Sequence, residues 1–484
     1  MPRPGKRGGR PIAVKANRCR RGAPRSVPHP HASVTSRWGW AMQASEREAL
    51  ARRAIELSAA PATEVCVFDE DSALTRFTHN SIHQNVAQRS ITVRIRAVAG
   101  KRQGVASCDV LDDAGLRGAA QRALEIAHLS PEDAELQPLA GPATFGTPPG
   151  AFVDATAQAQ PQRRAEIAKA IFRQMEDQEQ WGAGFVTTGS SGITLATSAG
   201  LVASYDATDA AINVKANAAT STGFAEQYTR DEDELNGSAV GGRAAGKARL
   251  GSDPRAVDVG DWTVILEPAA CGELLSYLAQ HFSAQSYVDG SSFLSDGLDR
   301  AYAGQNVTIR DDYSHPAVLG MPFDFEGSAT RPVTLIDHGI GRHVVTDAYY
   351  AGRLGVENTG HALPAPNAYG PQPRTLILEP GSKSREEMIA HTKRGLLVTR
   401  FWYIRPVDQR QTIVTGMTRD GTFLIENGRV VGGVRNMRFN QSILDALRAC
   451  EPASEPVRTG GYSYQCVVPA VKIERFHFSS GTEF

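Results

Sequence analysis

One side chain of the kind that binds zinc, the imidazole of His281, stands in the segment S-Y-L-A-Q-H at 276–281. The segment lies in a run from 269 to 284 whose pattern predicts a helix, directly after a strand-like run at 263–266. Zinc-dependent hydrolysis needs about three protein ligands and commonly a carboxylate near the metal-bound water. One histidine does not meet this need. His281 is either a lone ligand completed by a second chain or a core histidine that is hydrogen-bonded locally.

Two further sets of polar side chains could bind a ligand. Asp324 and Glu326, in a loop-like segment, offer oxygen ligands for a hard cation or polar lining for a peptide cavity. Arg400, beside two aromatic residues, could hold a peptide carboxylate through two parallel hydrogen bonds. Because Arg400 and Trp402 share one side of a predicted strand, the alternative is a cation–π contact within a structural strand. Both interpretations of Arg400 stay open.

The elements that would position these residues change in character along the chain. Helix and strand patterns alternate over 45–129, a segment rich in proline and glycine at 130–150 predicts a linker, and a second mixed region follows at 151–250. Within it, the sequence G-S-S-G at 189–192 predicts a turn between two short strands. From 259 to 484, short β-rich runs between turns predict a largely antiparallel, barrel-like domain. The expected fold class is therefore α+β, with an N-terminal mixed α/β region before this β-rich domain.

Charge is distributed unevenly along the chain. The 484 residues carry 52 basic and 52 acidic side chains, and ten of the basic ones precede Glu46, before which there is no acidic residue. The body is therefore acidic, which disfavours nucleic-acid binding. Residues 1–41 are interpreted as a disordered basic tail or a mis-called start. The cysteines are scattered, which indicates reduced thiols. The sequence contains no apolar run of about 18 residues, so no membrane span is predicted. These features favour a cytoplasmic protein.

Six short motifs in the C-terminal half occur in the order typical of one protein family. They are M-P-F-D-F-E-G at 321–327, G-V-E-N-T-G-H-A at 355–362, L-E-P-G at 378–381, G-L-L-V-T at 395–399, F-L-I-E-N-G at 423–428 and P-A-V-K-I at 469–473. On these residues the chain resembles the TldD/PmbA family, and the resemblance covers nearly everything after Ser45.

The resemblance implies a division of labour between two kinds of subunit. TldD-type members bind zinc through a His-Glu-x-x-x-His motif and a distant cysteine, and they hydrolyse peptides. PmbA-type (TldE) members lack the motif and pair with TldD in a cytoplasmic peptidase. In this chain Ser276 and Tyr277 replace the first histidine and the glutamate, and only His281 remains. The resemblance thus implies a subunit that binds no zinc itself and supports proteolysis only with a zinc-bearing TldD-type partner, in leader-peptide trimming or the degradation of unfolded peptides.

The sequence is also compatible with two other functions. The chain could be an autonomous enzyme that has repurposed the family's cavity in peptide or natural-product maturation. It could also be a DNA gyrase-modulating protein, as an older description of the family and the basic N-terminal arm suggest.

Overall fold

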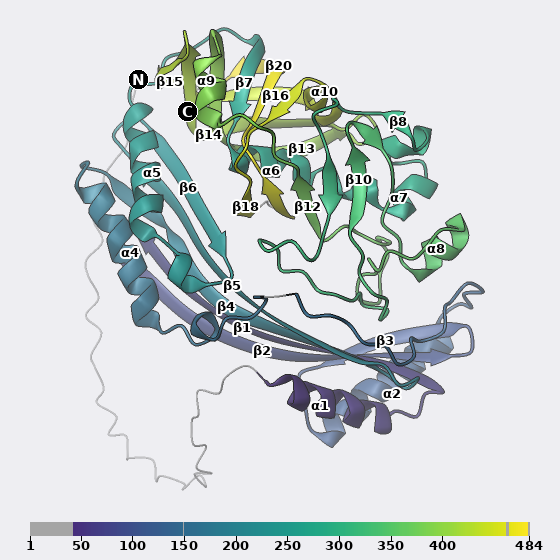
Figure 1. Ribbon diagram of the computed structural model, residues 1–484. Helices are drawn as coiled ribbons and strands as arrows, with labels where there is room; N and C mark the ends of the chain where they lie inside the picture. The colour runs from purple at the N-terminus through teal and green to yellow at the C-terminus, as the bar shows by residue number, and fades with distance from the viewer. Residues whose placement is uncertain (1–41, 149, 461–463, 483–484) are drawn as a thin grey trace, which may run out of the picture. The chain divides into compact units, whose positions relative to one another are not determined.

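The computed structural model describes residues 42–148, 150–460 and 464–482 (Figure 1). The predicted basic tail at 1–41 lies outside the described residues. The N-terminal half contains one six-stranded antiparallel sheet, whose strands come from both sides of the 130–150 segment and follow the order β3-β2-β1-β4-β5-β6. The strands are β1 (Ala62–Thr78), β2 (Ser81–Ala99), β3 (Arg102–Cys108), β4 (Trp181–Thr197), β5 (Val202–Asn217) and β6 (Thr222–Thr229).

Helices cover one face of this sheet (Figure 1). Apolar side chains at alternate strand positions, such as Val67, Phe77 and Ile212, point to that face and pack against helices. The helices are α1 (Ala44–Glu56), α2 (Asp113–Leu129), α4 (Pro161–Glu176) and α5 (Gly237–Leu250), and the short elements α3 (Asp154–Ala157) and η1 (Glu232–Glu234) complete this half. The opposite face, called here the open face, carries a row of directly paired residues: Arg76, Phe185, Asn213 and Glu226.

The turn predicted at 189–192 is wrong. Strand β4 continues through this segment and pairs with β1 on one side and β5 on the other. A Cβ atom at Gly192 would lie 2.4 Å from the guanidinium of Arg47, and one at Gly189 would lie 2.6 Å from the carbonyl oxygen of Asp71. These two glycines therefore allow close approach of neighbouring groups inside a strand instead of reversing the chain.

The C-terminal half contains a closed five-stranded barrel. Strand β13 pairs with β7 in parallel and with β14 in antiparallel orientation, which closes the ring β7-β20-β16-β14-β13. The predicted α+β class with a barrel-like C-terminal domain is confirmed. The ring strands are β7 (Gly260–Leu266), β13 (Arg394–Asp408), β14 (Ile413–Glu426), β16 (Met437–Ser442) and β20 (Val471–Gly481), with β15 (Arg429–Gly433) and β17 (Cys450–Pro452) paired to β14 and β20.

A second, seven-stranded sheet follows the order β18-β19-β12-β9-β10-β11-β8, and only its β12–β19 pair is parallel. Its strands are β8 (Arg300–Ala301), β9 (Ile309–Asp311), β10 (Val333–Asp337), β11 (Ile340–Gly341), β12 (Thr375–Leu378), β18 (Val457–Gly460) and β19 (Gln465–Val468). The helices of this half are α6 (Pro268–Ser276), α7 (Ala284–Val288), α8 (Ala348–Leu354), α9 (Arg385–Ala390) and α10 (Ile443–Arg448), with the 3₁₀ turns η2 (Ala279–Phe282) and η3 (Phe293–Asp296).

One large apolar cluster fills the C-terminal half. It joins α6 and η2 to the barrel through residues such as Leu274, Phe282, Phe401 and Phe476, all of them buried. Within the part of the chain that the structure describes, no helix has the length and apolar character needed to cross a membrane.

Candidate functional site

The helix that carries the motif positions is shorter than its pattern predicted. A single helix was expected over 269–284, but α6 ends at Ser276 and the chain then tightens into η2. The backbone N–H groups of Tyr277 and Leu278 donate to carbonyls three residues earlier, as in a 3₁₀ turn. The hydroxyl of Ser276 donates to the carbonyl oxygen of Glu273 at 2.8 Å and so competes for an acceptor of the helix.

The three motif positions do not converge on one point. The Ser276 hydroxyl is turned back onto its own helix, as described above. The phenol of Tyr277 donates to the carbonyl oxygen of Ile404 in β13 at 2.8 Å. The ring of His281 lies against Phe293, with 5.3 Å between ring centroids. Each side chain therefore has a different environment, and together they do not offer the ligand set of a zinc site.

His281 is a core residue in this structure. Only 2% of its surface is exposed, and its Nδ1 atom has no hydrogen-bond partner among the described residues. Burial lowers the pKa of its imidazole to about 4, and the charge of Arg410 acts in the same direction. The ring is therefore neutral near pH 7, and it lacks the local hydrogen bond that the sequence interpretation expected.

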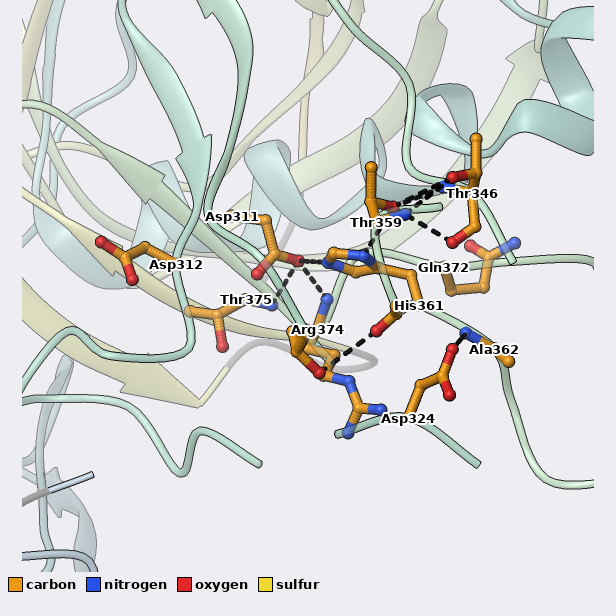
Figure 2. A network of polar contacts seen from close by, with 12 residues as sticks. Asp311, Asp312, Asp324, Thr346, Thr359, His361, Ala362, Gln372, Arg374 and Thr375 are labelled. Carbon is orange, nitrogen blue, oxygen red and sulfur yellow. Dashed lines mark hydrogen bonds and ion pairs between the residues drawn. The ribbon is translucent and has the colours of Figure 1, made fainter. Parts of the chain in front are cut away.

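Asp324 organises the loop that contains it. Its carboxylate is fully buried and accepts the backbone N–H groups of Glu326, Ser328 and Ala362 at 2.8–3.0 Å. Figure 2 shows the hydrogen bond to Ala362. With its oxygens used in this way, Asp324 holds two loops together instead of facing an open cavity. Glu326 is only partly buried, and its carboxylate accepts the N–H of Ala348 at 3.1 Å. Burial and the neighbouring Asp324 raise the pKa of Glu326 to about 7.

A buried network next to this loop was not foreseen from the sequence. Figure 2 shows His361 between Thr359, which lies 2.9 Å from its Nδ1 atom, and Asp311, whose Oδ2 lies 3.5 Å from its Nε2 atom. The Thr359 hydroxyl donates to the carbonyl oxygen of Thr346 and accepts its N–H. Asp311 also accepts the backbone N–H of Arg374. Asp311 and His361 are buried, and both hydrogen bonds of the Thr359 hydroxyl to Thr346 stay within the loops. This Asp–His–Thr arrangement therefore joins the loops and presents no free nucleophile.

A polar cluster connects α6, the barrel and the open face. The guanidinium of Arg400 in β13 lies 3.0 Å from the carboxylate of Asp420 in β14, and Lys215 of β5 lies 3.4 Å from the same carboxylate. Arg400 also lies over the ring of Phe224, 4.2 Å from its centroid, and 5.2 Å from that of Trp402. Arg400 thus makes the cation–π contact considered from the sequence and in addition forms an ion pair that was not predicted.

Two carboxyl groups beside Arg400 have strongly raised pKa values. Burial raises the pKa of Glu273 in α6 to about 8, and the positive charge of Arg400 opposes this shift. Burial likewise raises the pKa of Glu226 on the open face to about 7, again with Arg400 in opposition. Both groups therefore change protonation near neutral pH, a property common at functional sites. Neither residue carried a signal in the sequence, because the shift arises from burial.

Two family models match this chain. The PmbA/TldA metallopeptidase C-terminal domain matches residues 259–480, and the PmbA/TldA metallopeptidase domain 1 matches residues 63–127. Together they cover more than half of the sequence. The chain belongs to the PmbA/TldD family.

Relatives with assigned names are similar over part of their length. A metalloprotease of Methanothermobacter thermautotrophicus is 24% identical over 49% of this chain and 52% of that protein. The metalloprotease PmbA of Escherichia coli O157:H7 is 26% identical over 48% of this chain and 50% of that protein. The chain therefore spans about half the length of these curated relatives.

Solved structures of PmbA/TldD members share the fold over most of the chain. TldE from Thermococcus kodakarensis superposes with a TM-score of 0.80 at 22% identity and covers 90% of this chain and 100% of that chain. A protein of Thermotoga maritima, described as a candidate modulator of a DNA gyrase, gives 0.79 at 19% identity, with 90% and 100% covered. At these identities the similarity concerns the fold alone.

The PmbA/TldD signatures acquire physical roles in this structure. The aspartate of M-P-F-D-F-E-G is the loop-organising Asp324, and its Oδ2 accepts the N–H of Ala362, which closes the G-V-E-N-T-G-H-A motif. Two motifs distant in sequence therefore meet at one carboxylate. His361 directly precedes Ala362 in the second motif. This position was the only feature of the sequence that could have pointed to the buried network around His361.

Proposed function

We propose that this chain is the subunit without catalytic zinc in a two-subunit peptidase, and that its partner is a zinc-bearing TldD-type chain. The chain contributes a wall of the peptide-binding space, and the partner contributes the metal and the residues that cleave the peptide bond. The partner, the peptide substrate and a cytoplasmic setting all belong to this proposal. The five described cysteines are free thiols, which suits a reducing compartment.

The observation that carries the proposal is the state of the three motif positions. Zinc hydrolysis needs converging ligands and a group that moves protons. Here Ser276 bonds to its own helix, Tyr277 bonds to β13, and His281 is a neutral core residue. Among the described residues, no three His, Cys, Asp or Glu side chains gather in a way that could hold a metal ion. The side chains at these positions therefore do not fit zinc, and no catalytic step is assigned to this chain.

The same residues support a structural contribution to the peptide-binding space. Tyr277 ties the end of α6 to β13, and Glu273 of α6 accepts the N–H of Phe401 in that strand at 2.7 Å. The helix that carries a metal in TldD-type members is thus anchored here by hydrogen bonds within the chain. This anchoring would keep the wall rigid without a metal.

The proposal is tested by co-expression with the TldD-type protein of the same organism. A tagged copy of this chain should retain the untagged partner through affinity and size-exclusion steps, at equal stoichiometry. Peptide hydrolysis should appear in the complex and disappear with a chelator. Failure of the two chains to associate, together with chelator-sensitive hydrolysis by this chain alone, would overturn the proposal in favour of an autonomous enzyme.

A further inference from the structure

A pocket of about 470 Å³ opens between the open face of the N-terminal sheet and strand β13. Its lining includes three cationic side chains, two aromatic ones and one amide: Arg76, Lys215, Arg400, Phe185, Phe224 and Asn213. None of these residues belongs to the motif positions discussed above. A pocket of this size accommodates one or two amino-acid residues of a ligand.

The register of the sheet explains why these side chains share the pocket. Arg76 of β1 pairs with Phe185 of β4, which pairs with Asn213 of β5. Lys215 lies two residues beyond Asn213 on β5 and pairs with Phe224 of β6. Residues that pair directly, or that lie two apart on a strand, project to the same face. Except for Arg400, which comes from β13, the charges and rings therefore come from two adjacent rows of the open face.

The positive charge of the pocket is only partly compensated. The carboxylate of Asp420 is buried and serves both Arg400 and Lys215, and it also accepts the hydroxyl of Thr222 at 2.8 Å. Arg419, which does not line the pocket, lies 4.0 Å from the same carboxylate, so one negative charge is shared among three cations. Arg76 is exposed and has no acidic partner within ion-pair distance in the described part of the chain. An uncompensated positive charge in a concave site attracts an anion.

Two observations indicate which kind of anion the pocket suits. The Nε atom of Arg400 is buried and has no hydrogen-bond acceptor among the described residues, so Asp420 does not use the full donor capacity of this guanidinium. The nearby Glu273 and Glu226 have pKa values of about 8 and 7. Near neutral pH, Glu273 therefore carries little negative charge and Glu226 carries about half of one. The excess of about one to two positive charges suits a monoanion, and the rings of Phe185 and Phe224 suit an apolar group attached to it.

We propose that this pocket binds the C-terminal carboxylate of a short peptide. Arg400 and Lys215 hold the carboxylate, Arg76 adds long-range attraction, and Phe185 and Phe224 contact the last side chain. The inference rests on the peptide substrate of the proposed function, and it assigns to this chain the recognition of the peptide's end. It requires neither a partner nor a metal, because all the residues belong to one chain.

The test is titration calorimetry with the full chain alone, at low salt and pH 7. The probe is N-acetyl-Ala-Ala-Ala-Leu with a free carboxylate, compared with the same peptide as its C-terminal amide. A third peptide, N-acetyl-Ala-Glu-Ala-Leu amide, carries its negative charge on a side chain instead. We expect the free acid to bind at least ten-fold more tightly than the amide, and the internal glutamate to restore little of that difference.

Variants then locate the site. Lys215→Gln should weaken binding of the free acid by about ten-fold, and the exposed Arg76→Gln should weaken it by about three-fold without affecting the fold. Arg52→Gln, which removes an exposed charge from α1, is the matched control and should leave binding unchanged. Equal binding of acid and amide, no detectable binding of the acid, equal binding of the glutamate peptide, or insensitivity to both pocket variants would each overturn the pocket assignment.

The outcome is separable from that of the proposed function. Carboxylate binding by the single chain would stand even if no TldD-type partner associated with it. An active two-chain peptidase whose isolated non-zinc subunit showed no preference for the free acid would retain the proposed function and reject the pocket.

Discussion

The carboxylate of Glu273 in α6 accepts the backbone N–H of Phe401 in β13 at 2.7 Å. This bond fixes the helix with the motif positions to the strand that carries Arg400, the next residue back along the chain. The two regions that the sequence suggested as separate sites, at 276–281 and at Arg400, are therefore directly connected. Changes at Glu273 should affect both.

Replacement of Glu273 by glutamine should remove a pH-dependent loss of stability. The pKa of Glu273 is about 8 in the folded chain and 4.5 as its ordinary value, so the unfolded chain loses its proton at lower pH. Wild-type stability should therefore fall as pH rises from about 4.5 to 8. The glutamine can still accept the N–H of Phe401, and Glu273→Gln should raise the melting temperature by roughly 1–3 °C at pH 8.

The measurement is thermal unfolding of both proteins at pH 5 and pH 8. The difference should be present at pH 8 and nearly absent at pH 5. Glu166→Gln, at an exposed position of α4, is the matched control and should show no such pattern. A variant less stable than the wild type at pH 8 would show that Glu273 is ionised in the folded protein.

Replacement of His281 by methionine should reduce sensitivity to acid. The pKa of His281 is about 4 in the folded chain against an ordinary value of 6.5, so below pH 6.5 the unfolded chain binds the proton more readily. Stability should fall as pH falls from 6.5 to 4, by about 2–3 kcal/mol in total. His281→Met keeps a similar volume and lacks this titration. Chemical denaturation at pH 7 and pH 4.5 measures the difference, and equal acid losses in both proteins would contradict the neutral core histidine.

The ion pair at the barrel should depend on the charge of Asp420 and not on its shape. Asp420 has a positive φ of 52°, a conformation that asparagine also tolerates. Asp420→Asn keeps that backbone but leaves Arg400 and Lys215 without their shared anion, and it should destabilise the chain by about 2–3 kcal/mol. Asp445→Asn, which breaks an exposed pair with Arg448, should change stability little. Denaturant unfolding measures the free energy of unfolding of both variants. Equal losses would contradict a larger stabilising role for the ion pair of Asp420 with Arg400.

The family loop should collapse without the carboxylate of Asp324. Asp324→Ala leaves three backbone N–H groups in a buried region without their acceptor, which should cost about 2–4 kcal/mol. Asp324→Asn keeps one oxygen and should cost less. Denaturation gives the free energies, and limited proteolysis should show faster cleavage within 321–330 in the alanine variant. Unchanged proteolysis would contradict the organising role.

Much of the fold was predictable because alternation of apolar and polar residues reports burial directly. The run Ile91 to Arg96 alternates apolar and polar side chains, a pattern that predicts a strand with one buried face, and β2 buries Val93 and Ile95 there. The helix over 269–284 was mispredicted because its apolar pattern persists through a stretch where 3₁₀ bonds replace α-helical ones. The turn at 189–192 was mispredicted because glycine residues between strands usually indicate a chain reversal. Here Gly192 instead leaves room for the side chain of Arg47.

The candidate site was less accessible to sequence reasoning. Arg400 was singled out by its aromatic neighbours. Its ion-pair partner Asp420 and the second cation on that carboxylate, Lys215, lie on other strands, and Lys215 is almost 200 residues away in the sequence. Only the register of the open face brings Lys215 to Arg400. The raised pKa values of Glu226 and Glu273 depend on burial of their carboxyl groups in the folded chain, which no local pattern encodes.

The most direct test of the central claim is the zinc content of three purified samples: this chain alone, a TldD-type partner alone, and their complex. Peptide hydrolysis is assayed in parallel, with a partner whose motif glutamate is replaced by glutamine as the control complex. We predict less than one-tenth of an equivalent of zinc and no hydrolysis for this chain, one equivalent for the complex, and hydrolysis that the partner's glutamine variant abolishes. One tightly bound zinc per isolated chain, with hydrolysis that His281→Ala removes, would contradict the account.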